Sequence, residues 1–401
     1  MTKQLVKRAY KFRFYPTPDQ EAELVRTWGC VRFVYNKALA ERSRAWTQEQ
    51  RRVNYADTSK MLTQWKREAE TDFLQEVSHV PMQQGLRRLQ AAFTNFFEKR
   101  AQYPKFKSRH KSKLSLAYMP NGFRFKDGEL YIAKCKDPLN VVWSRECPIK
   151  SASSINITRD SSGRWFVSIL CEWTTEELSP TDKTVGIDLG VKDAIVLHTG
   201  ERMNPSDAFD VKRKQRAIVR AQKNLSRKAK GSANREKAKR KLARAHRKLS
   251  DAKRDWLHQT TTELVRRFDV LSIEDLNVRG MTSAAKGRGR KAKAGLNRGI
   301  MQHNFGEFRS MLEYKADWYG RTVVPIDRFY PSSKTCSECG QINTRLRLNH
   351  RSWRCAGCNT KHDRDINAAK NINAVGMAVY ACGDGVRPAK KPLASVAGNR
   401  Q

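Results

Sequence analysis

The chain has 401 residues, with 79 Lys and Arg against 40 Asp and Glu, and its formal net charge is +39. A chain of this length usually folds as several domains, and so large a positive charge predicts a polyanionic partner, DNA or RNA, because neutralised phosphates release counterions. The sequence has no run of 18 apolar residues and no uninterrupted apolar stretch near its first residue, so we expect neither a membrane protein nor an exported one.

The first hundred residues are predicted to form a strand followed by helices. Residues 5–15 alternate between apolar and basic side chains, which is typical of a half-buried strand. Residues 17–20 (Thr-Pro-Asp-Gln) then have the pattern of a capping box with proline at the first helical position. Apolar residues recur at helical spacing from there to about residue 100. This part is therefore predicted to be mostly α-helical.

The pattern changes to short strands between about residues 113 and 178. Runs such as 130–132 and 165–170 are rich in β-forming residues and are separated by Gly, Pro and Asp. We expect these strands to pair with the N-terminal one, in which case the helical part is an insertion in a β-barrel.

A third region begins at residues 184–190 (Thr-Val-Gly-Ile-Asp-Leu-Gly), a strand of the buried type. Further on, residues 211–254 contain 19 Lys and Arg but only two acids, and apolar residues recur at three-and-four spacing. Gly231-Ser232 divides this stretch into a predicted helical hairpin. We interpret the hairpin as an arm that faces phosphates; a solvated helix pair is the alternative.

A basic segment follows the next predicted strand, residues 270–274. Residues 283–298 are mostly Gly, Ala, Lys and Arg without an apolar period, and they are predicted to form a mobile loop. A helix with an apolar face and a short strand at 322–326 lead from this loop to the cysteines.

Four of the nine cysteines have the spacing of zinc ligands. Cys336-x2-Cys339-x15-Cys355-x2-Cys358 places two pairs on either side of a loop, so four thiolates can form a tetrahedron around one Zn²⁺. Four protein ligands leave no open coordination position, so this zinc is predicted to be structural. The other five cysteines are scattered, which favours a reducing cytoplasm over a disulfide-bonded protein.

Three acids have positions that suggest a catalytic site. Asp188 lies in a strand between apolar neighbours, Glu274 ends another apolar strand, and Asp365 begins an Ala-rich helix after the cysteines. Three converging carboxylates repel one another unless Mg²⁺ or Mn²⁺ lies between them, and phosphodiester hydrolysis uses such ions. The pattern alone leaves simpler interpretations open, because an Asp at a helix start is often an N-cap and an acid can merely end a strand.

These residues lie in segments that resemble the TnpB proteins, which are transposon-encoded RNA-guided nucleases related to compact type V CRISPR effectors. The resemblance rests on Gly-Ile-Asp188-Leu-Gly, on Ser-Ile-Glu274-Asp-Leu, on residues 330–340 around the first cysteine pair, and on residues 362–372 (His-Asp-Arg-Asp-Ile-Asn-Ala-Ala-Lys-Asn-Ile). It extends over nearly the whole chain and is most specific from Asp188 onward.

The resemblance implies a multidomain α+β protein: a RuvC-like nuclease of RNase H fold with an inserted zinc ribbon, a wedge β-barrel and a helical recognition lobe. The implied segments are a wedge strand at 1–16, the recognition lobe at 17–111, the wedge barrel at 112–180, the nuclease at 181–331 with its helical hairpin at 206–268, the zinc ribbon, a target-nucleic-acid-binding domain, at 332–360, the final nuclease motif at 361–380 and a flexible tail at 381–401.

The implied activity is that of an RNA-guided DNA endonuclease. Such a protein binds a structured guide RNA and double-stranded DNA, reads a short motif beside the target, and hydrolyses DNA by a two-metal mechanism with Mg²⁺ or Mn²⁺ held by Asp188, Glu274 and Asp365. Asp363 is a rival for the third position, but Asp365 fits the Asp-x-Asn-Ala-Ala-x-Asn-Ile pattern, in which Asn367 and the alanines are expected to let the helix pack close to the sheet. Residues 283–298 are expected to act as a flexible lid.

The resemblance also indicates nucleic-acid contacts outside the acids. Tyr55, Gln83 and Asn121 lie in the segments expected to read the target-adjacent motif, and Lys334 is placed to contact the scissile strand. Ordinary surface and turn positions are the alternative for each of them. We expect a bacterial or archaeal cytoplasmic protein that associates with the nucleoid, either a monomer or a homodimer, whose guide comes from a transposon end or a CRISPR array.

Two other functions remain open. The first is a guided DNA-binding protein or repressor without cleavage, and the second is a transposase that acts without a guide. All three acids are present in this chain, which favours the nuclease over a binding protein. A transposase could use three carboxylates as well, and it differs in needing no guide RNA.

Overall fold

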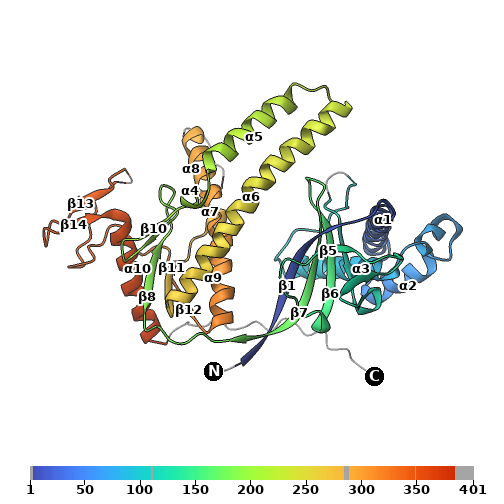
Figure 1. Ribbon diagram of the computed structural model, residues 1–401, viewed down its shortest axis with the longest axis horizontal. Coiled ribbons are helices and arrows are strands. Elements are labelled where there is room, and N and C mark those ends of the chain that lie inside the picture. Colours follow the sequence, from blue (N-terminus) through green and yellow to red (C-terminus); the bar gives the residue numbers. More distant parts are fainter. Residues whose placement is uncertain (1–2, 110–111, 284–288, 348, 384–401) are drawn as a thin grey trace. The chain divides into compact units, whose positions relative to one another are not determined.

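The computed structural model describes residues 3–109, 112–283, 289–347 and 349–383, and helices and strands both contribute to it (Figure 1). The chain divides into two compact units, one formed mainly by Leu5–Thr174 and the other mainly by the residues from Thr175 onward. In the part of the chain that is described, no helix combines the length and the apolar character that crossing a membrane requires.

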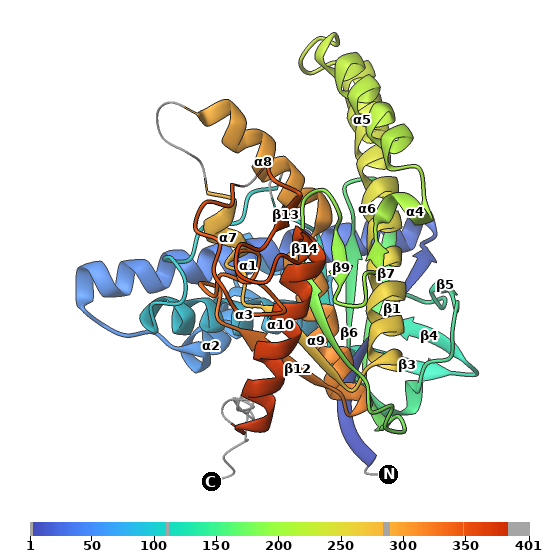
Figure 2. The same cartoon turned by 90° about the vertical axis from the view of Figure 1, so that its left-hand side faces the viewer.

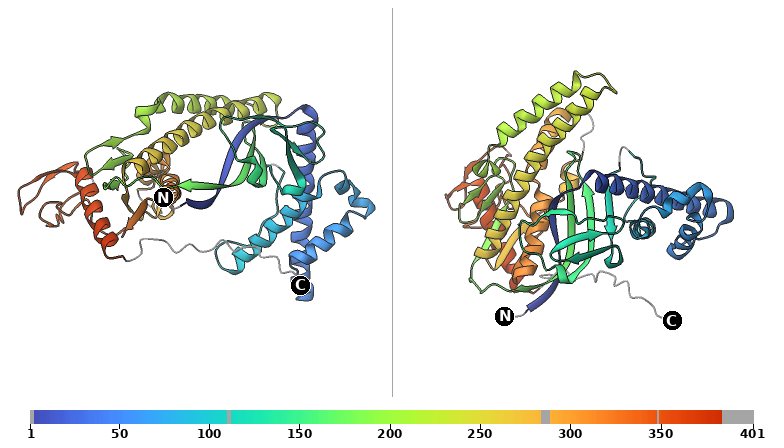
Figure 3. Two further views of the ribbon diagram at one scale, coloured as in Figure 1. Left: turned by 60° about the horizontal axis from the view of Figure 1, so that its bottom comes forward. Right: turned by 45° about the vertical axis from the view of Figure 1, so that its right-hand side comes forward.

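The first unit contains a five-stranded sheet with the order β2-β6-β7-β1-β5 (Figure 3). Tyr10, Phe12 and Phe14 of β1 are buried on one side of their strand, as their alternation predicts. The N-terminal strand thus pairs with the later ones, which confirms that expectation, while closure into a barrel stays a prediction. The strands of this sheet are β1 (Lys3–Tyr15), β2 (Ser115–Tyr118), β5 (Asn140–Val142), β6 (Ala152–Arg159) and β7 (Trp165–Glu176). A separate hairpin consists of β3 (Phe123–Lys126) and β4 (Glu129–Ile132).

The first helix of this unit begins where the capping pattern places it. Thr17 Oγ1 accepts a hydrogen bond from the Gln20 amide at 3.2 Å, and Gln20 Oε1 accepts one from the Thr17 amide at 3.1 Å, so the capping box is confirmed. Apolar faces of the helices join the inner face of the sheet in one hydrophobic core. The helices are α1 (Pro18–Glu49), α2 (Tyr55–Trp65) and α3 (His79–Phe97), with short 3₁₀ segments η1 (Ala69–Gln75), η2 (Pro120–Gly122) and η3 (Ile149–Ser151).

The second unit is built on a mixed sheet with the order β10-β9-β8-β11-β12. Its three strands β8, β11 and β12 are parallel to one another, whereas β9 runs antiparallel to β8, and β10 runs antiparallel to β9 at the edge of the sheet. Parallel neighbours end at the same edge of a sheet, so the last residues of β8 and β11 come together. The strands are β8 (Thr184–Asp188), β9 (Ile195–Leu197), β10 (Arg202–Met203), β11 (Val270–Glu274) and β12 (Thr322–Ile326).

Helices cover both faces of this sheet (Figure 2). Val185 and Ile187 of β8 face a core shared with α6 (Ala233–Arg267) and α9 (Phe305–Tyr319). Gly186, between them, faces α10 (Arg364–Ala381) on the other side, where a Cβ atom at this glycine would lie 2.0 Å from the Ala369 carbonyl oxygen. The helix therefore lies directly against the strand backbone.

The basic stretch forms the predicted helical hairpin. Helices α5 (Val211–Ser226) and α6 lie side by side (Figure 1). Gly231 adopts the left-handed conformation in the turn, with φ +86°, and Ser232 caps α6 by accepting a hydrogen bond from the Arg235 amide at 3.1 Å. The short helix α4 (Pro205–Ala208) precedes this hairpin.

The prediction of a loop at residues 283–298 is wrong for the second half of this segment. Residues 290–298 belong to α8 (Arg290–His303), which follows the short helix α7 (Val278–Met281); residues 284–288 lie outside the described part of the chain. Ala, Leu, Lys and Arg are strong helix formers even without an apolar period. Contacts also hold α8 in place, because Lys293 Nζ donates to the Met281 carbonyl at 2.6 Å and Asn297 Nδ2 donates to the Thr282 carbonyl at 2.9 Å.

The close contact at Gly186 leads to a stability prediction. Gly186→Ala should lower the melting temperature of the protein strongly, because overpacking costs about 1–3 kcal/mol or more and the obstacle here is backbone. Gly29→Ala is the matched control, since no atom lies within 4 Å of its added Cβ, and in the interior of α1 alanine should stabilise by about 0.5–1 kcal/mol. Thermal unfolding of both variants measures the difference; equal melting temperatures would contradict the packing of α10 described here.

Candidate active site

The three acids that the sequence singles out meet at one edge of the second unit. Asp188 is the last residue of β8, and Glu274 is the last residue of β11, the neighbouring parallel strand. Asp365 lies in the first turn of α10, the helix that packs against both strands. The negative charges of Glu274 and Asp365 both act on Asp188.

Burial makes the ionised forms of two of these acids less favourable and so raises their pKa values. Burial, and after it the charges of Glu274 and Asp365, raise the pKa of Asp188 to about 8, although the charge of Arg364 acts in the opposite direction. Burial also raises the pKa of Glu274, although Ser332 Oγ donates a hydrogen bond of 2.6 Å to its Oε1 and favours the ionised form. A positive ion placed among these carboxylates would relieve their repulsion.

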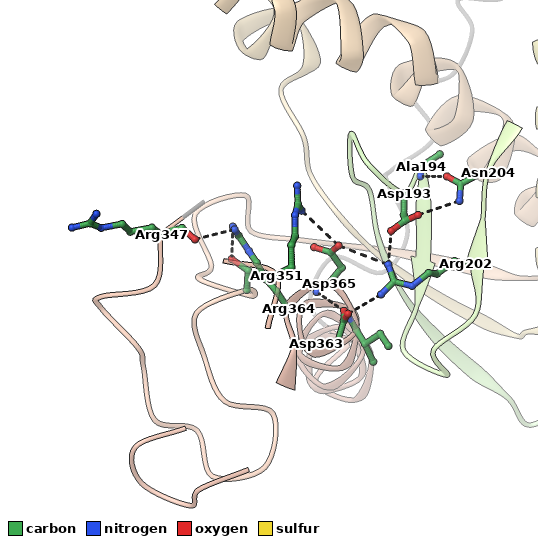
Figure 4. Close-up of polar contacts among 11 residues, drawn as sticks. Asp193, Ala194, Arg202, Asn204, Arg347, Arg351, Asp363, Arg364 and Asp365 are labelled. Atoms are coloured by element: carbon green, nitrogen blue, oxygen red, sulfur yellow. Dashed lines mark hydrogen bonds and ion pairs between the residues drawn. The ribbon is translucent and has the colours of Figure 1, made fainter. Parts of the chain in front are cut away.

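The neighbouring Asp363 has a different task from Asp365 (Figure 4). Asp363 is the N-cap of α10, and its Oδ1 accepts hydrogen bonds of 3.1 Å from the amides of Asp365 and Ile366. Its other oxygen accepts a hydrogen bond of 2.9 Å from Arg202. Asp365 lies near two arginines, since its Oδ2 is 3.9 Å from Arg202 Nη1 and 3.8 Å from Arg351 Nη1. The helix cap and the acid beside Asp188 are therefore two separate residues.

The four predicted zinc ligands lie together. The donor atoms of Cys336, Cys339, Cys355 and Cys358 are all within 4.8 Å of one another, and no other group of possible metal ligands in the described residues, the three acids included, reaches that spacing. The sequence analysis missed His362, whose Nε2 lies 3.1 Å from Cys336 Sγ and whose ring packs at a tilt against the ring of Trp353. The Lys-His-Asp run around His362 gives no sign of this contact; the pairing of β13 (Ser352–Arg354) with β14 (Lys361–Asp363) brings Trp353 opposite it.

The start of the cysteine region is tied to α10 by two buried asparagines. Asn371 Nδ2 donates to the carbonyls of Ser332 at 2.8 Å and of Thr335 at 2.7 Å, and Asn367 Nδ2 donates to the Thr335 carbonyl at 2.7 Å. The Ser337 amide donates to Asn367 Oδ1 at 3.0 Å. Asn367 thus bonds to the chain on both sides of Cys336, while the carbonyl of Ala369 lies against Gly186 of the sheet. A part for Asn367 in that close packing stays a prediction.

The residues proposed to read nucleic acid are distributed over both units. Tyr55 begins α2, and Arg87 of α3 donates a hydrogen bond of 3.3 Å to its hydroxyl. Gln83, partly exposed, lies one turn before Arg87 on α3, and Asn121 is exposed in η2. Lys334 is exposed in the other unit, two residues before the first cysteine. Their contacts with nucleic acid stay a prediction.

Asn121 lines an open basic cavity of about 570 Å³ within the first unit. Lys66, Arg67, His79 and Lys134 contribute to its wall. Burial lowers the pKa of Lys66, and the positive charge of Lys134 lowers it further. Two like charges held this way favour an anion between them.

Two relatives with known names match this chain over nearly its whole length. A relative from Streptomyces pristinaespiralis with the provisional name RNA-guided DNA endonuclease is 50% identical over 97% of this chain and 94% of its own. A second, from Escherichia coli (strain K12) and provisionally named RNA-guided DNA endonuclease InsQ, is 34% identical over 96% of each chain. This chain belongs to the TnpB family. Family models match it in three places: "Cas12f1-like, TNB domain" at 305–372, "Probable transposase" at 168–285 and "Helix-turn-helix domain" at 1–51.

Solved structures of RNA-guided effectors are similar only distantly to this TnpB-family chain. The mini-RNA-guided endonuclease CRISPR-Cas_phi3 has a TM-score of 0.44 and 10% identity, covering 92% of both chains. A Cas12f1 chain from a complex with sgRNA and target DNA has a TM-score of 0.34 and 16% identity, covering 92% of this chain and 99% of that one. Within the region of the helix-turn-helix model, the described residues form β1 and the single long helix α1.

The raised pKa of Asp188 leads to a pH prediction. Between its ordinary value of 3.8 and about 8 the folded protein keeps a proton on Asp188 that the unfolded chain releases, so stability is lost as the pH rises through this range. Asp188→Asn should therefore raise the melting temperature of the zinc-loaded protein, without added Mg²⁺ or Mn²⁺, at about pH 8.5, and the gain should vanish toward about pH 4.

The control for this experiment is Asp317→Asn, which changes an exposed acid of α9. Differential scanning fluorimetry across the pH range measures both variants against the wild type. A destabilised Asp188→Asn protein at the higher pH would contradict the unfavourable ionisation described above.

Proposed function

We propose that this TnpB-family protein is an RNA-guided DNA endonuclease whose hydrolytic centre consists of Asp188, Glu274 and Asp365. The observation that carries the proposal is the convergence of these acids at the ends of two adjacent parallel strands and the start of α10. Relatives that match nearly the full chain carry the same provisional name. The mixed sheet with helices on both faces supports a RuvC-like nuclease of RNase H fold.

The acids fit divalent cations, Mg²⁺ or Mn²⁺. They supply the carboxylate oxygens that such ions prefer, and their mutual repulsion disappears when positive charge is added. Bound there, such ions would activate water and stabilise the leaving oxygen of a phosphodiester. The chain's own residues prepare the site: Ser332 holds Glu274 in place, and Arg351 and Arg202 supply positive charge beside Asp365.

The four cysteines fit a structural Zn²⁺. Their donor atoms are already grouped, and His362 is placed to donate a hydrogen bond to the Cys336 thiolate, as partners of metal ligands often do. Because Ser332 and Thr335 precede the first cysteine and bond to α10, folding of this ribbon supports the helix that carries Asp365.

The partners we propose are a guide RNA and a double-stranded DNA target. The net charge of +39 and the basic helices α5 and α6 favour phosphate backbones. The basic cavity at Asn121 and the nearby α2 and α3 residues are candidates for reading the target-adjacent motif, and base pairing with the guide would choose the rest of the target. Lys334 is a candidate contact to the scissile strand.

The test of the function begins with the RNA. The protein is purified from cells that also carry the flanking genomic DNA of its gene, the bound RNA is sequenced, and cleavage of a matched duplex is measured with and without Mg²⁺. We expect one structured RNA species with a variable guide end and cleavage that requires the metal. A guided binding protein would retain the RNA but leave the duplex intact, and a transposase would yield no defined RNA.

The carboxylates are tested one at a time in the RNA-loaded protein. Asp188→Asn, Glu274→Gln and Asp365→Asn should each slow cleavage by about a thousandfold, because metal stabilisation of the transition state is worth several kcal/mol. Target binding, measured by gel shift, should stay unchanged. Asp363→Asn and the exposed Asp317→Asn should cleave faster than any of the three, and cutting by Asp188→Asn at the wild-type rate would refute this centre.

The zinc assignment is tested through Cys355→Ser. The variant should lose its one equivalent of zinc, measured by elemental analysis, and should lose cleavage with it, because the ribbon unfolds and the support of α10 is lost. Cys382→Ser, at the end of α10 and exposed, should keep both zinc and activity. Unchanged cutting by Cys355→Ser would contradict the supporting role.

A further inference from the structure

We propose that Asp193 and Arg202 are positioning residues that hold the third carboxylate, Asp365, through the N-terminal turn of α10. As far as it concerns cleavage, this inference rests on the function proposed above. Neither the strand-end acids nor the cysteine spacing in the sequence predicts a role for Asp193 or Arg202.

A single guanidinium connects the acids around α10 (Figure 4). Arg202 Nη1 lies 2.5 Å from Asp193 Oδ2, and Arg202 Nη2 lies 2.9 Å from Asp363 Oδ2. The same Nη1 atom is 3.9 Å from Asp365 Oδ2. The two terminal nitrogens of Arg202 therefore bind different parts of the unit: Nη1 binds Asp193, before β9, and Nη2 binds Asp363, at the start of α10.

Hydrogen bonds also hold Asp193, the partner of Arg202 beside the sheet, in place. Asn204 Nδ2 donates a hydrogen bond of 3.2 Å to Asp193 Oδ1, and the Ala194 amide donates one of 2.8 Å to Asn204 Oδ1. Arg202 pairs with Val196 across the β9–β10 ladder. The arginine thus extends from a hairpin whose ladder continues into β8, the strand of Asp188.

The helix side of the bridge ends at the cap. Asp363 accepts the amide hydrogens of Asp365 and Ile366 through Oδ1, which leaves Oδ2 for Arg202. Moving Asp363 would therefore move the backbone of Asp365. A capping aspartate held from outside fixes the first turn of a helix more firmly than the cap alone, because the side chain cannot rotate away.

The solvent exposure of these side chains indicates whether the ion pairs act mainly on stability or on the orientation of Asp365. The side chains of Asp193 and Asp365 are 14% and 18% exposed, while Arg202 is 30% exposed. Isolated ion pairs at the surface contribute little to stability. Orientation is the larger effect here, because outer partners of metal ligands typically change metal affinity or activity by about 10–100-fold when removed.

The first experiment measures positioning without cleavage. Hydrogen–deuterium exchange of the full-length, zinc-loaded protein without added Mg²⁺ follows the amides of Asp365 and Ile366. In Arg202→Met these amides should exchange about tenfold faster than in the wild type, because the cap is weakened, while β11 stays protected. Unchanged exchange would overturn the inference.

The matched control removes a different arginine, Arg267 of α6, which contacts the same hairpin. Arg267 binds the two oxygens of Glu201, the residue before Arg202, at 3.1 and 2.6 Å. Arg267→Met should leave exchange at the start of α10 unchanged. If it accelerates that exchange as much as Arg202→Met does, the effect is a general loosening of the hairpin and the proposal fails.

The second experiment measures the chemical step in the RNA-loaded protein. At saturating target, Arg202→Met should cleave about 10–100-fold more slowly with unchanged target affinity. Arg202→Lys should not restore the rate, because one ammonium cannot replace a planar fork between two carboxylates. Full rescue by lysine would mean that charge beside Asp365 is sufficient, and it would overturn the positioning role.

A double variant tests whether the two residues act as one unit. Asp193→Ala should resemble Arg202→Met, and the double variant should be no slower than Arg202→Met alone. Additive losses would overturn the link. Should Arg202→Met fail to fold, Asp193→Ala keeps the arginine and tests the same bridge by both methods. Failure of the wild type to cleave would refute the proposed function. The exchange data do not depend on cleavage, so they test the positioning of Asp365 by Arg202 even in that case.

Discussion

The close contact between α10 and the sheet is the constraint on which the rest of the site depends. Neither Gly186 of β8 nor Gly376 of α10 leaves room for a side chain, since an added Cβ would lie 2.0 Å from the Ala369 carbonyl oxygen or from Ser272 Oγ. The helix backbone therefore lies against the strands. Only then does Asp365, in the first turn, come within electrostatic reach of the strand end at Asp188.

The same contact concentrates charge that opposes folding. Burial and neighbouring acids raise the pKa of Asp188, so the metal-free site favours a proton where the proposed function needs an ion. The favourable terms lie elsewhere, in the apolar core between the sheet and helices α6 and α9 and in the arginines around Asp365. A site with unfavourable local energy held by a well-packed core is what functional sites commonly require.

Much of this could be predicted from local pattern. Alternation identified β1, and the capping residues identified the start of α1. Asp188 was recognisable as an acid among apolar strand residues and Glu274 as one that ends an apolar strand. Local pattern failed for α8, because its glycines and the missing apolar period outweighed its Ala, Leu, Lys and Arg, which are strong helix formers. It also could not reveal Arg202, whose partner Asp363 is 161 residues away, because only the fold brings them together.

The cysteine region shows why distant segments depend on one another here. It lies in the sequence between β12 and α10, and the asparagines of α10 bond to the carbonyls of Ser332 and Thr335, where the chain leaves the sheet. Ser332 also donates its hydroxyl hydrogen to Glu274. One short segment therefore fixes the second acid directly and the helix of the third acid through its backbone. Disorder of this segment would therefore disturb both acids at once.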